Sequence, residues 1–194
     1  MRTISLLPAA MLFAGCVSYG ATNSPVTEQN AVEVPELVGH WRIPHLVDSP
    51  ACLAIQPLAE RTYRARLDSC EQGHGQALLA EFSRFGGELF AVIRQEVADT
   101  TVQPGDGVLL LYEFYRVRTR NDSLFTANLR ADELRDYLVN HPAELPFALL
   151  EGNGPDLLLT GTPEQLAVFL SAHARDTLLW SSDSAPEGWW ARVR

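Results

Sequence analysis

The sequence predicts a mainly β protein whose strands follow one another as an antiparallel up-and-down meander, with two helices toward the C-terminus. One observation is a series of seven strand-like runs between residues 40 and 129, each separated from the next by a short turn. Another is a pair of later segments with apolar residues at helical spacing. Because a flat sheet of this many twisted strands leaves exposed edges, we expect it to curve strongly or to close into a barrel.

The N-terminal segment has the pattern of a cleaved secretory signal. Arg2 supplies a positive charge, and residues 4–13 form an apolar run too short to cross a bilayer as a helix. The small residues Ala14 and Gly15 stand immediately before Cys16. This ending resembles the lipobox of bacterial lipoproteins, in which the signal is cut off before a lipid-modified cysteine.

The lipoprotein resemblance implies that residues 1–15 are removed and that acyl chains on Cys16 hold the protein on a membrane. Val17 stands where such proteins often carry an aspartate for inner-membrane retention, which implies the outer membrane, facing the periplasm. In the alternative, Cys16 only lies near an ordinary cleavage site such as Ala21. Residues 16–35 are polar and lack an apolar period, which predicts a flexible linker after the lipidated cysteine.

Size and charge predict one domain, residues 36–194, and disfavour some partners. The chain has 194 residues, 46% of them hydrophobic, which is enough to build a core unaided. The formal net charge is −9, and all 15 basic residues are arginines. We expect no nucleic-acid partner, because an acidic chain without a basic block neutralises phosphates poorly.

The first predicted strand, residues 40–47, places Trp41, Ile43, His45 and Val47 on one face. His45 is therefore a candidate ligand contact on the inner face of the sheet. The alternative is a histidine that is simply hydrogen-bonded inside a barrel.

Two cysteines fall in the next hairpin. The strand-like runs 51–55 and 63–67 flank a turn near residues 60 and 61, and residue 61 is the midpoint between Cys52 and Cys70. A symmetric hairpin brings the two sulfurs opposite each other. Outside the cytoplasm such a pair tends to oxidise, so we predict a structural disulfide.

Four further strands are predicted before the helices. Residues 76–84 and 89–97 are joined at Gly86-Gly87, a tight-turn signal. Residues 108–119 and 123–129 are joined at Asn121-Asp122.

The strand 108–119 offers two alternatives for a binding site. With odd positions inward, Glu113 and Tyr115 face the interior, where a carboxylate must be paired or lie at a pocket. With even positions inward, Tyr112 and Phe114 line a cavity and Arg116 lies with other arginines at one rim, suited to an anionic head group. A solvated outer face is the simpler explanation for the arginines.

The helices are expected near residues 131–140 and 163–174. His141-Pro142 ends the first, and Thr162-Pro163-Glu164-Gln165 has the order of a capping box with proline at the first helical position. His141 and His173 both suit a helix C-terminus. The tail Trp189-Trp190 is expected to pack back on the domain or to contact a partner.

The segment Leu37-Val38-Gly39-His40-Trp41, placed just before a strand meander, resembles the G-x-W signature of lipocalins and lipocalin-like lipoproteins. The resemblance implies a lipocalin-like barrel in which Gly39 allows a close-packed entry turn. It also implies that Trp41 plugs the closed end.

No catalytic motif, metal-ligand spacing or nucleotide-binding glycine pattern is present, so we expect a protein that is not an enzyme and needs no cofactor or metal. The favoured function is a lipocalin-like binding module for a small apolar or amphipathic ligand. The alternative is a structural lipoprotein with a filled barrel that docks an envelope protein.

Overall fold

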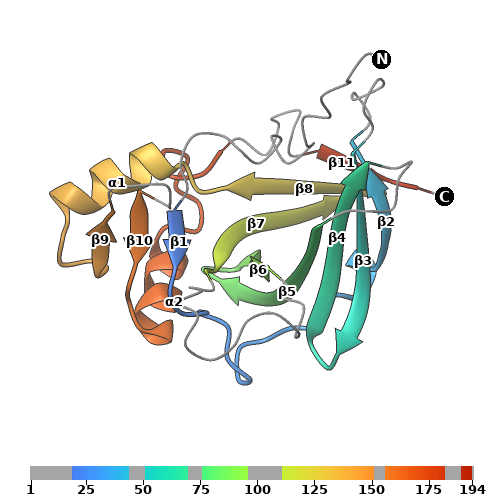
Figure 1. Ribbon diagram of the computed structural model, residues 1–194, viewed down its shortest axis with the longest axis horizontal. Coiled ribbons are helices and arrows are strands. Elements are labelled where there is room, and N and C mark those ends of the chain that lie inside the picture. Colours follow the sequence, from blue (N-terminus) through green and yellow to red (C-terminus); the bar gives the residue numbers. More distant parts are fainter. Residues whose placement is uncertain are drawn as a thin grey trace, which may run out of the picture.

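Eight strands of the described chain form a closed antiparallel barrel, which confirms the predicted fold class (Figure 1). The computed structural model describes residues 19–43, 51–69, 76–95, 111–150, 156–181 and 189–193. The barrel strands are β2 (Gly39–Arg42), β3 (Ala51–Ala59), β4 (Thr62–Ser69), β5 (Gln76–Phe85), β6 (Glu88–Gln95), β7 (Glu113–Arg120), β8 (Ser123–Asn128) and β11 (Trp189–Arg192). Strands β2 to β8 pair in sequence order, as a meander requires, and β11 lies between β8 and β2.

The aromatic tail closes the barrel. Trp190 pairs with Leu124 of β8, and Arg192 pairs with Trp41 of β2. The prediction that the tail packs back on the domain is confirmed, and its four residues are the strand that removes the last open edge.

Tight turns form one end of the barrel. Residues 60–61, 86–87 and 121–122 join neighbouring strands, as the sequence predicts, and Gly86, Gly87, Asn121 and Asp122 all have positive φ angles. Gly86 also has no room for a side chain, because a Cβ there would lie 2.4 Å from the carbonyl oxygen of Ser171. We call this the closed end and the opposite end, where β3, β5 and β7 begin, the mouth.

A second layer covers part of the barrel's outer wall, and we call it the cap (Figure 1). It contains a three-stranded sheet, in the order β1-β10-β9, and two helices. Its elements are β1 (Tyr19–Ala21), α1 (Ala131–Asn140), β9 (Phe147–Leu149), β10 (Leu157–Leu159) and α2 (Pro163–Ala172). The capping box at Thr162 is formed, and α2 ends at Ala172, two residues before the predicted end.

The prediction of a flexible linker over residues 16–35 is wrong for the part of that segment that the structure describes. Residues 19–21 form β1, which pairs in parallel with β10, and the 3-10 helix η2 (Pro35–Leu37) begins inside the predicted linker. Val34 is also buried.

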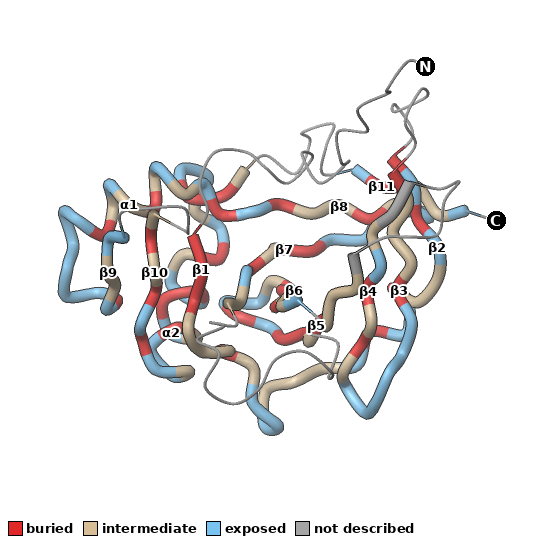
Figure 2. Tube along the Cα trace, in the orientation of Figure 1, coloured by how far each residue is buried: buried red, intermediate tan, exposed pale blue. Residues whose placement is uncertain are grey.

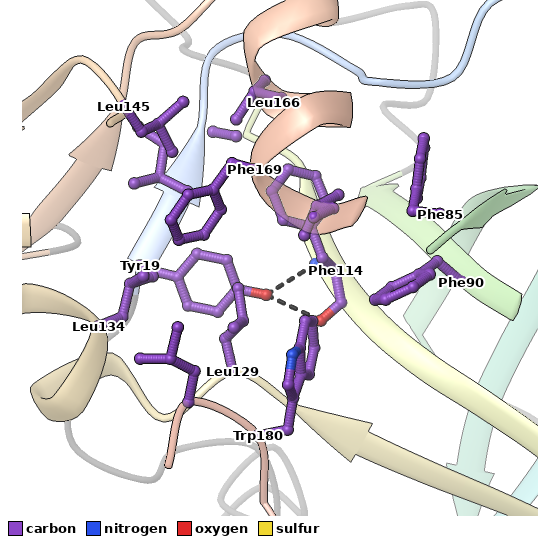
Figure 3. Close-up of a cluster of buried hydrophobic side chains, with 14 of the residues drawn as sticks. Tyr19, Phe85, Phe90, Phe114, Leu129, Leu134, Leu145, Leu166, Phe169 and Trp180 are labelled. Carbon is purple, nitrogen blue, oxygen red and sulfur yellow. Dashed lines mark hydrogen bonds between the residues drawn. The ribbon is translucent and has the colours of Figure 1, made fainter. Parts of the chain in front are cut away.

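Tyr19 explains how so polar a segment is held. Its hydroxyl accepts a hydrogen bond from the Phe114 amide at 2.7 Å and donates one to the Phe114 carbonyl at 2.9 Å (Figure 3). Strand β8 does not extend as far as Phe114, because its last residue, Asn128, pairs with Tyr115. The Tyr19 hydroxyl therefore satisfies two buried backbone groups that lack a strand partner.

Two hydrophobic clusters lie on opposite faces of the barrel wall, and buried positions run through both layers (Figure 2). The cap core includes Phe90, Phe114, Leu134, Phe169 and Trp180. The barrel core includes Trp41, Ile55, Phe82, Val117 and Trp190. Among the described residues, no helix is long and apolar enough to span a bilayer.

Candidate ligand-binding site

The barrel encloses a cavity of about 330 Å³. Strands β3 to β8 and β11 contribute to its wall, and Leu37 of η2 lies toward the closed end. Five lining residues have polar or charged side chains, and the others are aliphatic or aromatic: the five are Arg94, Gln95, Glu113, Tyr115 and Thr126. This is an apolar chamber with a few polar groups, which is the usual composition of a small-molecule site.

Small side chains keep the chamber open. Ala65 on β4, Ala80 on β5 and Ala91 on β6 all face the cavity from neighbouring strands. Alternation along each strand brings these positions to the inner face, and an alanine there leaves the space that a larger residue would fill.

Trp41 blocks the closed end below the chamber. Its side chain is 1% exposed, and its indole Nε1 donates a hydrogen bond to the Leu37 carbonyl at 3.0 Å. The guanidinium of Arg192 lies 4.3 Å from the centre of the indole ring and donates to the carbonyls of Val38 and Glu36. Arg192, on β11, thus connects β2 through a cation–π contact with Trp41, and it connects the η2 segment through two hydrogen bonds.

Gly39 lies at the entry to β2 beside this arginine. Its φ angle is +140°, and a Cβ there would lie 3.0 Å from Nη1 of Arg192. Both the backbone conformation and the tight space favour glycine at this position.

Odd positions of β7 face the cavity, so Glu113 and Tyr115 lie in its wall. The Tyr115 hydroxyl donates a hydrogen bond to Glu113 Oε2 at 2.6 Å. Burial, followed by the nearby charge of Glu113, raises the pKa of Tyr115 well above its usual value. The hydroxyl therefore remains a protonated donor at neutral pH.

The alternative that placed Tyr112 and Phe114 in the cavity is wrong. Phe114 is fully buried in the cap core (Figure 3). Tyr112 packs against the same cluster. Strand β7 is covered on both faces, so its even positions have a core of their own. Sequence alternation alone cannot distinguish two buried faces.

The β7 arginines do not gather at the rim of the cavity. Arg116 is buried in the outer wall, where its Nη1 donates to the Ala174 carbonyl at 3.0 Å and its guanidinium lies 5.8 Å from the Trp180 ring. Arg118 pairs with Glu88 at 3.1 Å, and Arg175 bonds the same carboxylate at 2.8 Å. Burial alone raises the pKa of Glu88, but the hydrogen bonds from the two arginines hold it below its ordinary value. The contacts of Arg116 and Arg175 attach the barrel wall to the cap.

Three predicted site residues lie outside the described residues: Cys16, His45 and Cys70. Cys52 lies on β3 opposite Asp68 of β4, and Asp68 comes two residues before Cys70 in the sequence. The Cys52–Cys70 disulfide stays a prediction.

A polar cluster on the cap was not predicted. The Tyr137 hydroxyl donates to Glu144 Oε1 at 2.8 Å, and His173 Nε2 lies 3.0 Å from Glu144 Oε2. His173 Nδ1 lies 3.6 Å from the carboxylate of Asp176, and the His141 ring stacks on Tyr137 at 4.4 Å between centres. Burial and the bond to Glu144 raise the pKa of Tyr137 to about 12.

The cluster links the ends of both helices. Hydrogen bonds from Tyr137 and then His173 hold the pKa of Glu144 below its ordinary value. Sequence analysis placed His141 and His173 at helix ends, where they lie, but it had no signal for Glu144, which comes from the segment after α1. The described residues contain no group of three or more His, Cys, Asp or Glu side chains arranged to hold a metal ion.

Comparison of the chain with protein-family models, with curated proteins and with solved structures finds no match.

Proposed function

We propose that this protein is a cell-envelope lipoprotein whose barrel binds one small apolar or amphipathic ligand. The observation that carries the proposal is the chamber of about 330 Å³ inside the barrel. This volume is near the lower limit of ordinary small-molecule pockets, which span roughly 300–1,000 Å³.

The chemistry of the wall supports an amphipathic ligand. Aliphatic and aromatic side chains provide most of the lining, while Glu113, Tyr115 and Thr126 provide polar groups on one side. Thr126 also accepts a long hydrogen bond, 3.4 Å, from the indole of Trp190. An apolar ligand body would replace water against the wall, and the polar groups would orient its head.

The lipocalin resemblance at Gly39 and Trp41 supports the same function. It implies a barrel that is closed at one end and open to a ligand at the other. In the described part of the chain, the Trp41–Arg192 contact lies at the tight-turn end, and the polar lining residues Gln95 and Glu113 lie near the other.

The membrane anchor and the outer-membrane location rest on the lipobox resemblance. Cys16 precedes the first described strand by only three residues, which span at most about 11 Å when extended. An anchor at Cys16 would therefore hold the cap close to the bilayer surface.

Native mass spectrometry of the protein purified gently from an oxidising periplasm tests the binding function. We expect a reproducible extra mass of a few hundred daltons that is lost on denaturation. A bare mass after gentle purification, together with no uptake of added apolar compounds, would contradict it and would favour the partner-docking alternative, in which the barrel binds no ligand.

A second experiment tests the anchor. Cys16→Ser is expected to abolish partitioning of the protein into detergent, with Cys52→Ser as the matched control that retains the anchor. Unchanged partitioning of the Cys16→Ser variant would contradict the lipoprotein assignment and leave the binding function standing.

A further inference from the structure

We propose that the ligand of the barrel is a cationic amphiphile: an amine head group that lies against Glu113 and an apolar body that fills the chamber below it. The inference rests on the proposed binding function and specifies the chemical class of the ligand. It follows from the charges in the cavity wall and from the hydrogen bonding of Glu113.

Glu113 is the one carboxylate among the described residues that line the cavity. Arg94 also borders the cavity, but alternation along β6 directs it outward, because Ile93 packs in the barrel core and Val92 in the cap core. Register places Glu113 opposite Ile93 rather than Arg94. No ion pair joins Glu113 to any described residue.

The hydrogen bond from Tyr115 prepares the Glu113 carboxylate for a ligand. The protonated Tyr115 hydroxyl donates to Oε2 at 2.6 Å, so it orients the carboxylate without neutralising it. The carboxylate keeps acceptor capacity, since each of its oxygens has two lone pairs. An ammonium group carries several N–H donors and a positive charge, and it complements this site.

The size of the chamber restricts the apolar part. A volume of about 330 Å³ suits one short alkyl chain or one ring system and excludes a lipid with two long chains. Ala65, Ala80 and Phe82 line the space in which that chain would lie.

Three probes that share one chain and differ in head group test the inference: decylamine, decanol and decanoate. Calorimetric titration of the delipidated full-length protein at pH 7 measures each dissociation constant. We expect decylamine to bind about tenfold or more tightly than decanol, as for a hydrogen bond to a charged group, and decanoate to bind most weakly. The preference for decylamine should shrink as salt is raised, because the Glu113 side chain is exposed to solvent.

Glu113→Gln is the decisive variant, because the amide oxygen still accepts the Tyr115 hydroxyl while the charge is lost. The variant should bind decylamine and decanol within about threefold of each other, with decanol affinity unchanged from the parent. Glu60→Gln, which removes an exposed carboxylate in the turn between β3 and β4, is the matched control and should retain the full decylamine preference.

The outcomes separate the two proposals. If decanol binds and decylamine binds no more tightly, the cationic-ligand inference is wrong and the binding function stands. Tightest binding of decanoate, lost in Arg94→Gln, would overturn the inference in favour of an anionic ligand. If none of the three probes binds, the binding function itself fails.

Discussion

The barrel core and the cap core share one wall, yet one is hollow and the other is filled. Strand β7 contributes to both: Glu113, Tyr115 and Val117 line the cavity, while Phe114 and Arg116 pack in the outer layer. The cap core brings large aromatic rings together, such as Phe90 and Trp180, whose ring centres are 5.3 Å apart. The barrel core instead has small side chains on three neighbouring strands, Ala65, Ala80 and Ala91.

The difference indicates that the two parts of this small domain have separate roles, stability for the cap and binding for the chamber. A barrel with an internal void gives up dispersion contacts along its inner face, and its wall must be stabilised elsewhere. The cap provides this stabilisation, because it covers the outer face of β6 and β7 with a packed apolar cluster. We therefore expect mutations in the cap to affect stability and mutations in the chamber to affect binding.

The largest expected effect comes from truncation of Phe114, whose ring is fully buried in the cap core. Phe114→Ala should lower the free energy of unfolding by about 3–5 kcal/mol, because it leaves a cavity in a packed region. Urea unfolding measures the change. The matched variant Ile93→Ala, in the chamber wall, should cost clearly less, and an equal or larger cost there would contradict the comparison.

Removal of one hydroxyl tests how the cap is attached to the barrel. Tyr19→Phe leaves the Phe114 amide and carbonyl without their shared partner, so we expect a loss of about 1–3 kcal/mol in unfolding free energy. Tyr63→Phe is a suitable control, since that hydroxyl accepts only one bond, from the Val34 amide at 2.9 Å. A smaller loss for Tyr19→Phe than for the control would argue against the attachment.

Filling the chamber should separate binding from stability. Ala65→Leu adds apolar volume to the void, and we expect unfolding free energy to rise by about 0.5–1 kcal/mol. Decanol affinity should fall about tenfold or more in the same variant because the space is occupied. A variant that kept its decanol affinity would indicate that the ligand lies elsewhere.

The smallest expected effect concerns the polar cluster of the cap. The pKa of Glu144 is lower in the folded state than in the unfolded chain, so its stabilising contribution is present above the unfolded pKa and lost as pH falls through the folded pKa. The carboxylate is partly exposed, so the contribution should be about 0.2–1 kcal/mol.

Urea midpoints at pH 6 and at pH 3 measure this contribution, and Glu144→Gln should flatten that part of the pH dependence. Glu28→Gln, at an exposed position of the N-terminal segment, provides a control for general loss of an exposed carboxylate. If both variants reduced the pH dependence of the urea midpoint equally, the proposed contribution of the Glu144 hydrogen bonds would be contradicted.

Several elements were predictable because their signals are local. Gly86-Gly87 and Asn121-Asp122 specify tight turns through backbone conformation, and Thr162 with Gln165 specifies the start of α2 through hydrogen bonds within four residues. Alternation also identified Glu113 and Tyr115 as a pair on one face. It left open which face is inside.

Other elements depend on residues far apart in the chain and had no local signal. Tyr19 lies in a polar segment, and its role appears only when Phe114, 95 residues later, presents two unpaired backbone groups. Strand β11 has only four residues, which are too few to be recognised as a strand from the sequence. It becomes a strand because it pairs with the open edges of β2 and β8.

The sequence by itself therefore determined the antiparallel meander, the turns, the two helices and the pairing of odd positions on β7, because each depends on neighbours within a few residues. Only the tertiary structure decided that the barrel closes through β11, that the N-terminal segment joins a cap, and that the inner face is hollow while the outer face is filled. The physical reason is that burial is a property of the assembled wall: the same alternating strand is compatible with either face inside, and only packing against Tyr19, α1 and α2 selects one.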